Sequence, residues 1–303
     1  MNAREKSLAA AAAQSGPGDL AAISARLEAR QAAWAQIVRD LEAAGRQPKM
    51  RIPKPPVILQ PAADFLTIVS PQALEQVRDL ALVEAARTQD MAILAGGLLT
   101  YGRLAFEHDV RIDSGVDHCA YLSSAIEAMA GNDLALVRRM LPQAYGLSHT
   151  GERLAKAGCN LLMALLYGDA AWKDQALAEG RGALEKKNVA FFAARTAFLM
   201  ALVEGDGVAA SMALDEAAAS YLKTRLLFDV RSPFLKVFAP ALHGLYNLAR
   251  HLLPAEAFAR AALPDHPAIW PDYVAYQQAH GFAPARPWPV FVGAVSPLNQ
   301  VVA

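Results

Sequence analysis

The chain has few cysteines and no excess of charge of either sign. Only Cys119 and Cys159 are cysteines among its 303 residues, and they lie 40 positions apart. Two cysteines make no disulfide framework and this spacing fits no zinc motif, so we expect two buried thiols in helices. Lys and Arg number 29 and Asp and Glu also number 29. The lack of a basic excess argues against nucleic acid as a partner, and the lack of an acidic excess excludes a DNA mimic.

Long hydrophobic runs are also missing. The longest, residues 189–203, is interrupted by Arg195, and a membrane-spanning helix needs about 20 apolar residues. Arg4, Lys6 and the alanines after them have some features of a signal peptide, but Gln14 ends the run too early. We therefore expect a cytoplasmic protein with no membrane partner and no cofactor.

What the chain does contain is alanine and other hydrophobic residues. Hydrophobic residues make up 54% of the sequence and charged residues 19%, which excludes an intrinsically disordered chain. Alanine runs occur at residues 9–13 and 217–219, and alanine is the best helix former. No segment shows the sustained alternation of apolar and polar residues that is typical of strands. The composition predicts an all-α fold.

A turn motif recurs at a fixed interval. Gly131-Asn132-Asp133, Gly168-Asp169 and Gly205-Asp206 follow one another at intervals of 37 residues. Glycine favours the left-handed conformation that ends a helix, and Asp or Asn caps the next helix. A period of this length with two helices predicts an α-solenoid-like array of antiparallel helical hairpins. The repeat length and residue pattern differ from a consensus tetratricopeptide repeat.

Prolines and glycines divide the chain into segments. We expect a flexible tail over residues 1–17 and a single helical domain over residues 18–303. Within the domain the predicted order is an N-terminal helix at 18–46, an extended linker at 47–70, the hairpin array at 71–262 and an irregular, proline- and aromatic-rich cap at 263–303. The cap should hold a short helix near residues 272–280 and cover the last hairpin.

The densest polar cluster lies at residues 107–118. Its members are Glu107, His108, Asp109, Asp113, Asp117 and His118. Histidines and carboxylates at this density could hold a hard metal or perform acid–base chemistry, with His108, Asp113 and His118 as the ligand set. Solvated turns and helix caps use the same residue types. We favour a solvated turn first, a partner-facing acidic patch second and a metal site third.

Two later regions carry histidine and aromatic residues. One runs from Phe228 to Pro233 and continues to His243-Gly244, where a buried histidine is expected to make a local hydrogen bond rather than to bind a ligand. In the other, Trp270 and Tyr273 stand at helical spacing and predict core packing. We find no nucleophile triad, Cys/His dyad, paired-carboxylate motif or glycine-rich phosphate loop, so we predict that the chain is not an enzyme.

Three stretches of the sequence resemble a known family. Residues 198–206, 214–216 and 238–250 are similar to the later part of the all-helical immunity proteins of bacterial polymorphic toxin systems, nearest to the group catalogued as immunity protein family forty-nine. The similarity covers about residues 70–285 and lies in the general residue pattern and order of the predicted helices. The resemblance implies a non-enzymatic cytoplasmic protein that binds a cognate toxin and occludes its active site.

We hypothesise that the turn edge of the array carries the interface with the toxin. The candidate contacts are all acidic: Glu107, Asp109, Asp113, Asp117, Asp169, Glu204 and Asp206. Such an edge would complement a basic toxin cleft. The alternatives are a helical-repeat scaffold or regulator, and a helical metal-dependent enzyme that uses the 107–118 cluster. The oligomeric state is left open.

Overall fold

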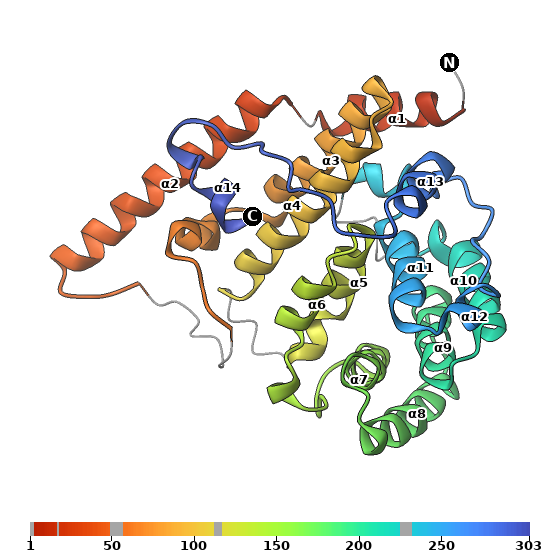
Figure 1. Ribbon diagram of the computed structural model, residues 1–303. Coiled ribbons are helices and arrows are strands. Elements are labelled where there is room, and N and C mark those ends of the chain that lie inside the picture. Colours follow the sequence, from red (N-terminus) through yellow and green to blue (C-terminus); the bar gives the residue numbers. More distant parts are fainter. Residues whose placement is uncertain (1–2, 17, 49–56, 112–116, 225–231) are drawn as a thin grey trace. The chain divides into compact units, whose positions relative to one another are not determined.

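The structure is a computed structural model that describes residues 3–16, 18–48, 57–111, 117–224 and 232–303. These residues form helices and connecting segments without a strand, which confirms the all-α prediction (Figure 1). None of the helices in these ranges has the length and hydrophobicity needed to cross a bilayer. The contacts divide the chain into two units, residues 1–114 with 284–303 and residues 115–283. The prediction of a single domain stays a prediction.

The first unit is built around the helix pair α3 (Pro71–Thr88) and α4 (Met91–Asp109). Ser70 caps α3 and Asp90 caps α4, each by accepting a hydrogen bond from a backbone N–H of the first turn. The two helices pack along their lengths, and a Cβ on Gly97 would lie 2.1 Å from the Cβ of Ala81. The missing side chain therefore sets how closely α3 and α4 approach.

Two N-terminal segments differ from the sequence prediction. Residues 1–17 were expected to be a flexible tail, but α1 (Ala3–Ser15) is helical, in keeping with the propensity of its alanine run. The predicted extended linker contains a 3₁₀-helix, η1 (Pro61–Ile68), whose Phe65 and Leu66 are buried. Pro61 stands at the first helical position, where a proline is compatible with a helix, and no proline follows until Pro71.

The long helix α2 (Leu20–Ala43) confirms the predicted N-terminal helix. Asp19 caps it, and the carboxylate of this residue accepts a hydrogen bond from the N–H of Ala22 at 2.7 Å. Ile23 and Leu27 on one face are buried in the core that η1 and α3 share. The buried residues of α2 therefore lie on a single stripe near its start, and Trp34 packs against the same core.

The predicted C-terminal cap is divided between the two units. The expected short helix is present as α13 (Pro271–Ala279) in the second unit, but residues 284–303 belong to the first unit. There the N–H of Trp288 donates to Oγ1 of Thr100 at 2.9 Å, and a Cβ on Gly96 would lie 2.6 Å from the carbonyl oxygen of Arg286. The final segment, with η6 (Gly293–Val295) and α14 (Leu298–Val301), therefore covers α4 and α2 of the first unit.

The second unit contains the repeated hairpins. They are α5 (Leu122–Ala130) with α6 (Leu134–Met140), α7 (Arg153–Tyr167) with α8 (Ala170–Leu184), and α9 (Ala190–Glu204) with α10 (Gly207–Tyr221). Gly168 and Gly205 adopt φ values of 69° and 72°, as the motif predicted, and the next residue caps the following helix. The first turn differs, because Asn132 rather than Gly131 takes the left-handed conformation. Asp133 then caps α6.

The fourth helix pair does not stack on the third hairpin as a further repeat, but returns to the first. α11 (Pro240–Leu252) packs more on α5 than on α10, and the short α12 (Ala255–Phe258) follows it. A Cβ on Gly244 would lie 1.8 Å from the carbonyl oxygen of Ile126, so α11 and α5 touch backbone to backbone. The remaining short helices are η2 (His118–Tyr121), η3 (Gln143–Tyr145) and η5 (Pro233–Lys236).

We expect Gly244→Ala to destabilise the protein. The new methyl group must push α11 away from α5, which should lower the free energy of unfolding by about 3 kcal/mol, net of the better helix propensity of alanine. Urea unfolding followed by circular dichroism measures the change. The matched control is Gly182→Ala in α8, where a Cβ meets nothing within 4 Å. This variant should gain about 0.5–1 kcal/mol, and equal losses in both variants would contradict the close-contact explanation.

Candidate functional site

The beginning of the 107–118 cluster forms a buried ion-pair network in the first unit. Glu107 is 1% exposed, and its carboxylate lies 2.6 Å from Nη1 of Arg111. Nη2 of Arg111 donates to the carbonyl oxygen of Gln60 at 2.6 Å and lies 3.3 Å from the carboxylate of Asp64. Glu107 therefore joins the end of α4 to η1 and is not placed to touch a partner, which corrects its predicted role. The Glu-to-Arg spacing of four residues was the sequence signal for this pair.

His108 and Asp109 form a second local arrangement. Nδ1 of His108 lies 2.9 Å from Oδ1 of Asp109, and Nε2 lies 3.1 Å from the carbonyl oxygen of Val69. Both ring nitrogens of this buried histidine therefore face protein oxygens. Asp109 keeps 38% of its side chain exposed and remains accessible. Asp113, which belongs to both the proposed acidic edge and the alternative metal site, lies outside the described residues.

Asp117 organises a loop of the second unit. Its carboxylate lies 2.5 Å from Nδ1 of His118 and accepts hydrogen bonds from the backbone N–H groups of His118, His149 and Thr150. Burial raises the pKa of Asp117, but the N–H donors and the charge of His118 outweigh it and lower the pKa to about 2. The side chain predicted to contact a partner thus holds residues 148–150 against the start of η2.

The alternative metal site is not assembled in the described residues. Glu107, His108, Asp109, Asp117 and His118 each contact neighbouring protein groups. Over the described ranges no three His, Cys, Asp or Glu side chains come together as metal ligands would.

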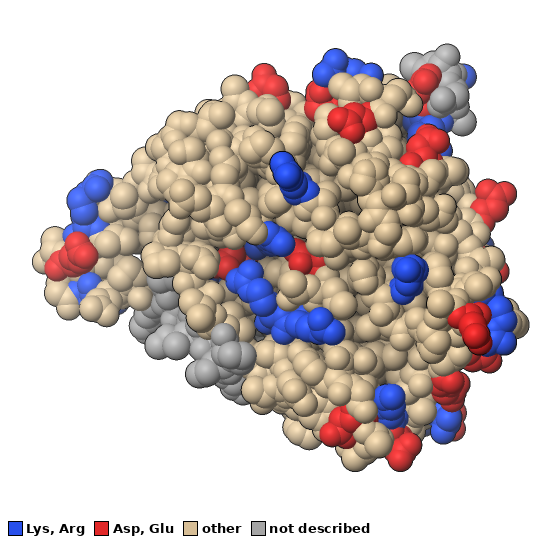
Figure 2. All heavy atoms as spheres, in the orientation of Figure 1, with Lys and Arg blue, Asp and Glu red and all other residues tan. Residues whose placement is uncertain are grey.

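The acids of the repeat turns lie on the surface of the second unit. Asp169 and Asp206 are exposed and cap α8 and α10, and Glu204 lies 2.9 Å from Nη2 of Arg181. On the face drawn in Figure 2, acidic and basic side chains stand beside one another over α8 and α9. These three acids are accessible, but the neighbouring bases dilute the acidic character of the edge.

His243 and the aromatic residues near it form part of the core of the second unit. His243 is fully buried, its ring stacks on Phe238 at 4.4 Å, and Nε2 accepts a hydrogen bond from the N–H of Trp270 at 3.3 Å. Burial lowers the pKa of His243 to about 3, so the ring is neutral at physiological pH. Tyr273 is also fully buried and donates to the carbonyl oxygen of Ala130. The predicted core packing is confirmed, but the hydrogen bond of His243 joins it to a residue 27 positions away rather than to a local partner. Residues 228–231 lie outside the described ranges.

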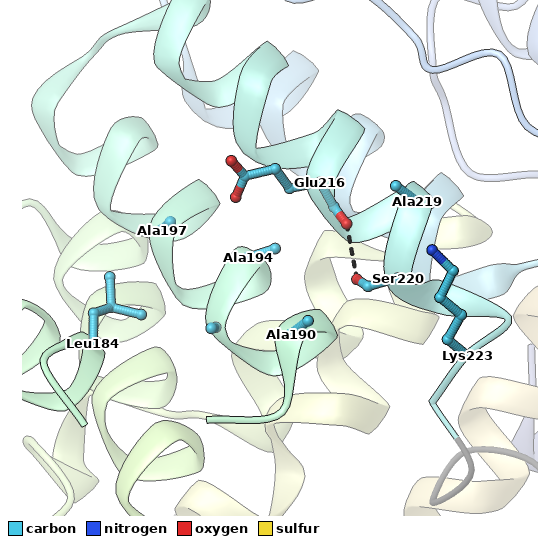
Figure 3. Close-up of a pocket in the computed structure, with 9 residues that line it drawn as sticks. Leu184, Ala190, Ala194, Ala197, Glu216, Ala219, Ser220 and Lys223 are labelled. Atoms are coloured by element: carbon cyan, nitrogen blue, oxygen red, sulfur yellow. Dashed lines mark hydrogen bonds between the residues drawn. The ribbon is translucent and has the colours of Figure 1, made fainter. Parts of the chain in front are cut away.

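Sequence reasoning missed a hollow between α9 and α10. It has a volume of about 520 Å³, and its floor is made mostly of alanine (Figure 3). The lining residues are Leu184, Ala190, Ala193, Ala194, Ala197, Glu216, Ala219, Ser220 and Lys223. The hydroxyl of Ser220 donates to the carbonyl oxygen of Glu216 at 2.8 Å, so it is satisfied within α10. We call this hollow the α9–α10 groove.

The two charged residues of the α9–α10 groove stand at different points along it. Lys223 extends past Ser220 toward Ala219, and Glu216 extends toward Ala197 (Figure 3). They are seven positions apart in the sequence, with Glu216 inside α10 and Lys223 just after the end of this helix. The groove therefore has a positive end, a negative end and an apolar floor.

Exposed apolar side chains continue the groove along α10. Met212 is 63% exposed and stands one turn before Glu216 on the same face, and Val208, 49% exposed, stands one turn before Met212. Leu222 and Val189 are 43% and 41% exposed near the other end. The signal in the sequence was that residues 189–203 are apolar nearly all round, whereas neighbouring helices cover only part of α9. A grouped set of exposed apolar side chains is typical of an interaction surface.

Comparison of the chain with protein-family models, curated proteins and solved structures gave no match. The function is therefore inferred from the geometry of the described residues. That geometry offers a shaped apolar surface with a charge at each end.

We expect Asp117→Asn to weaken the protein and to change its acid sensitivity. The substitution removes a charged acceptor for several N–H groups, which should cost about 1–2 kcal/mol at neutral pH. The carboxylate contributes stability above its unfolded pKa of about 3.9, and this contribution is lost as the pH falls toward the folded value of about 2. Urea unfolding from about pH 5 to pH 2 should thus show a smaller pH slope in the variant. Asp215→Asn, at an exposed position of α10, is the control, and identical slopes in wild type and Asp117→Asn would contradict the assignment.

Proposed function

We propose that this chain binds a protein partner through the α9–α10 groove and that the partner is a bacterial toxin, which it neutralises. The observation that carries the proposal is the alanine-floored hollow of about 520 Å³ bordered by the exposed Met212 and Val208. Small residues let a second helix approach closely, and an amphipathic helix laid in an apolar groove is a common mode of protein recognition. The occupant we infer is therefore a helix of the partner.

The charges of the groove define the chemistry of that helix. Lys223 favours an acidic residue of the partner at its end, and Glu216 favours a basic residue at the other end. Between them the partner needs a stripe of apolar side chains that fits over Ala193, Ala197 and Ala219. This combination of an apolar centre and charged ends is typical of specific interfaces.

The proposal moves the toxin-binding surface away from the acidic turn edge. Glu107 is buried with Arg111, and Asp117 is engaged in its own loop, so neither offers a free carboxylate to a partner. Asp169, Glu204 and Asp206 remain accessible and can serve as peripheral contacts. Toxin as the class of partner comes from the resemblance of residues 198–206 and 238–250 to immunity proteins. That the chain is not an enzyme stays a prediction.

The test measures binding to the product of the gene immediately upstream of the gene for this chain, which the proposal expects to be the toxin. Ala219→Trp fills the α9–α10 groove from an exposed position and should weaken affinity at least about 100-fold, which corresponds to about 2.7 kcal/mol. Isothermal titration calorimetry gives the affinity, and growth of a host that expresses the toxin gives neutralisation. The matched control is Ala178→Trp, at an exposed alanine of α8 outside the groove.

Each outcome of this test decides one part of the proposal. If both variants bind the toxin as tightly as wild type, the groove is not the interface. If wild type neither binds nor neutralises the toxin, the partner class is wrong. Binding that survives in Ala178→Trp but not in Ala219→Trp, with loss of growth in the latter, supports both parts.

A further inference from the structure

Arg195 is a buried cation of the second unit that forms no ion pair with a carboxylate of the described residues. The residue lies in α9 and is 5% exposed. Its Nη1 donates to Oγ of Ser123 at 3.1 Å, its guanidinium carbon lies 4.9 Å from the centre of the Phe192 ring, and its buried Nε has no hydrogen-bond acceptor. A serine hydroxyl and an aromatic face do not neutralise a guanidinium.

The other two fully buried arginines of the described chain are neutralised. Arg78 lies 2.8 Å from the carboxylate of Asp79, and Arg111 lies 2.6 Å from that of Glu107. Near Arg195 the charged neighbour is Glu152, which raises the pKa of Arg195, but desolvation dominates and lowers that pKa to about 10. The carboxylate of Glu152 accepts a hydrogen bond from the N–H of Ala155 as the cap of α7. Arg195 therefore carries its charge at neutral pH, with Glu152 as a charged neighbour but with no carboxylate of the described residues in direct contact.

A short route connects this charge to the surface. Ser123, at the start of α5, is exposed, so the guanidinium lies one hydrogen bond away from solvent. The hydroxyl oxygen accepts from Arg195, which leaves the hydroxyl proton free to be donated to a third group. A group that accepts this proton and carries negative charge would complete the site.

We propose that Arg195 and Ser123 form a binding site for a phosphate group. A tetrahedral oxyanion can accept from the hydroxyl and from the guanidinium at the same time, and it supplies a negative charge in direct contact with Arg195. Neither residue lines the α9–α10 groove, so this site does not depend on the proposed function. Both free inorganic phosphate and a small phosphate monoester carry the required chemistry.

The experiment compares the thermal stability of the full chain in sodium phosphate and in sodium chloride at equal ionic strength. Phosphate stabilises many proteins without binding to a site, so the decisive quantity is the gain of wild type minus the gain of Arg195→Met. We expect a saturable extra rise in Tm for wild type and none for Arg195→Met. Titration calorimetry with inorganic phosphate and with glycerol phosphate then identifies which source binds more tightly, and the affinity should fall at least tenfold in Arg195→Met.

A second variant guards against misfolding of Arg195→Met. Ser123→Asp places a carboxylate beside Arg195 from an exposed position. It should raise Tm in chloride, because it supplies the counter-charge, and should abolish the saturable response to phosphate. Equal phosphate gains in wild type and Arg195→Met, or an unchanged saturable response in Ser123→Asp, would overturn the proposal.

Discussion

Close contact between helices at small residues is the constraint on which the second unit depends. Gly244 lets α11 touch the carbonyl oxygen of Ile126, and Gly207 lets the start of α10 touch the carbonyl oxygen of Ala257. At such distances even a methyl group forces the backbones apart, so the helix positions are fixed by where side chains are missing. The many alanines also allow helices to pack closely, though less closely than glycine does. Alanine favours helix formation, and its small side chain lets neighbouring helices approach from several sides.

Buried charge is the second constraint, and the buried arginines differ in whether a carboxylate pairs with them. Arg78 and Arg111 are tied to carboxylates of nearby residues, and both pairs fix local geometry in the first unit. Removing one member of such a pair leaves an uncompensated charge, which is why paired acids are poorly suited to partner binding. Arg195 lacks this compensation within the described chain and therefore stands apart. Comparison of the three buried arginines therefore identifies Arg195 as the one whose surroundings favour an additional negative charge.

The sequence predicted those features of the fold that are decided locally. Asp169 and Asp206 cap helices after Gly168 and Gly205 because a cap needs only the residues beside it. The return of α11 to α5 and of Trp288 to α4 depends on contacts between residues far apart in the chain, and the missing Cβ atoms at Gly244 and Gly96 become informative only once their neighbours are known. The helix α1 differs from the predicted tail because the helix propensity of its alanines outweighs the turn residues that follow it.

The same division explains the candidate sites. The sequence of a polar cluster such as residues 107–118 does not show which side chains point outward. In the structure Glu107 is buried and pairs with Arg111. The α9–α10 groove was missed for the opposite reason, because apolar residues were assumed to be buried. A helix such as α9, apolar nearly all round, needs partners on every side. Within the unit it has them on the side of Phe191 and Phe198, while Ala190, Ala193 and Ala197 line the groove. A helix of another protein would complete the packing that the alanine surface already favours.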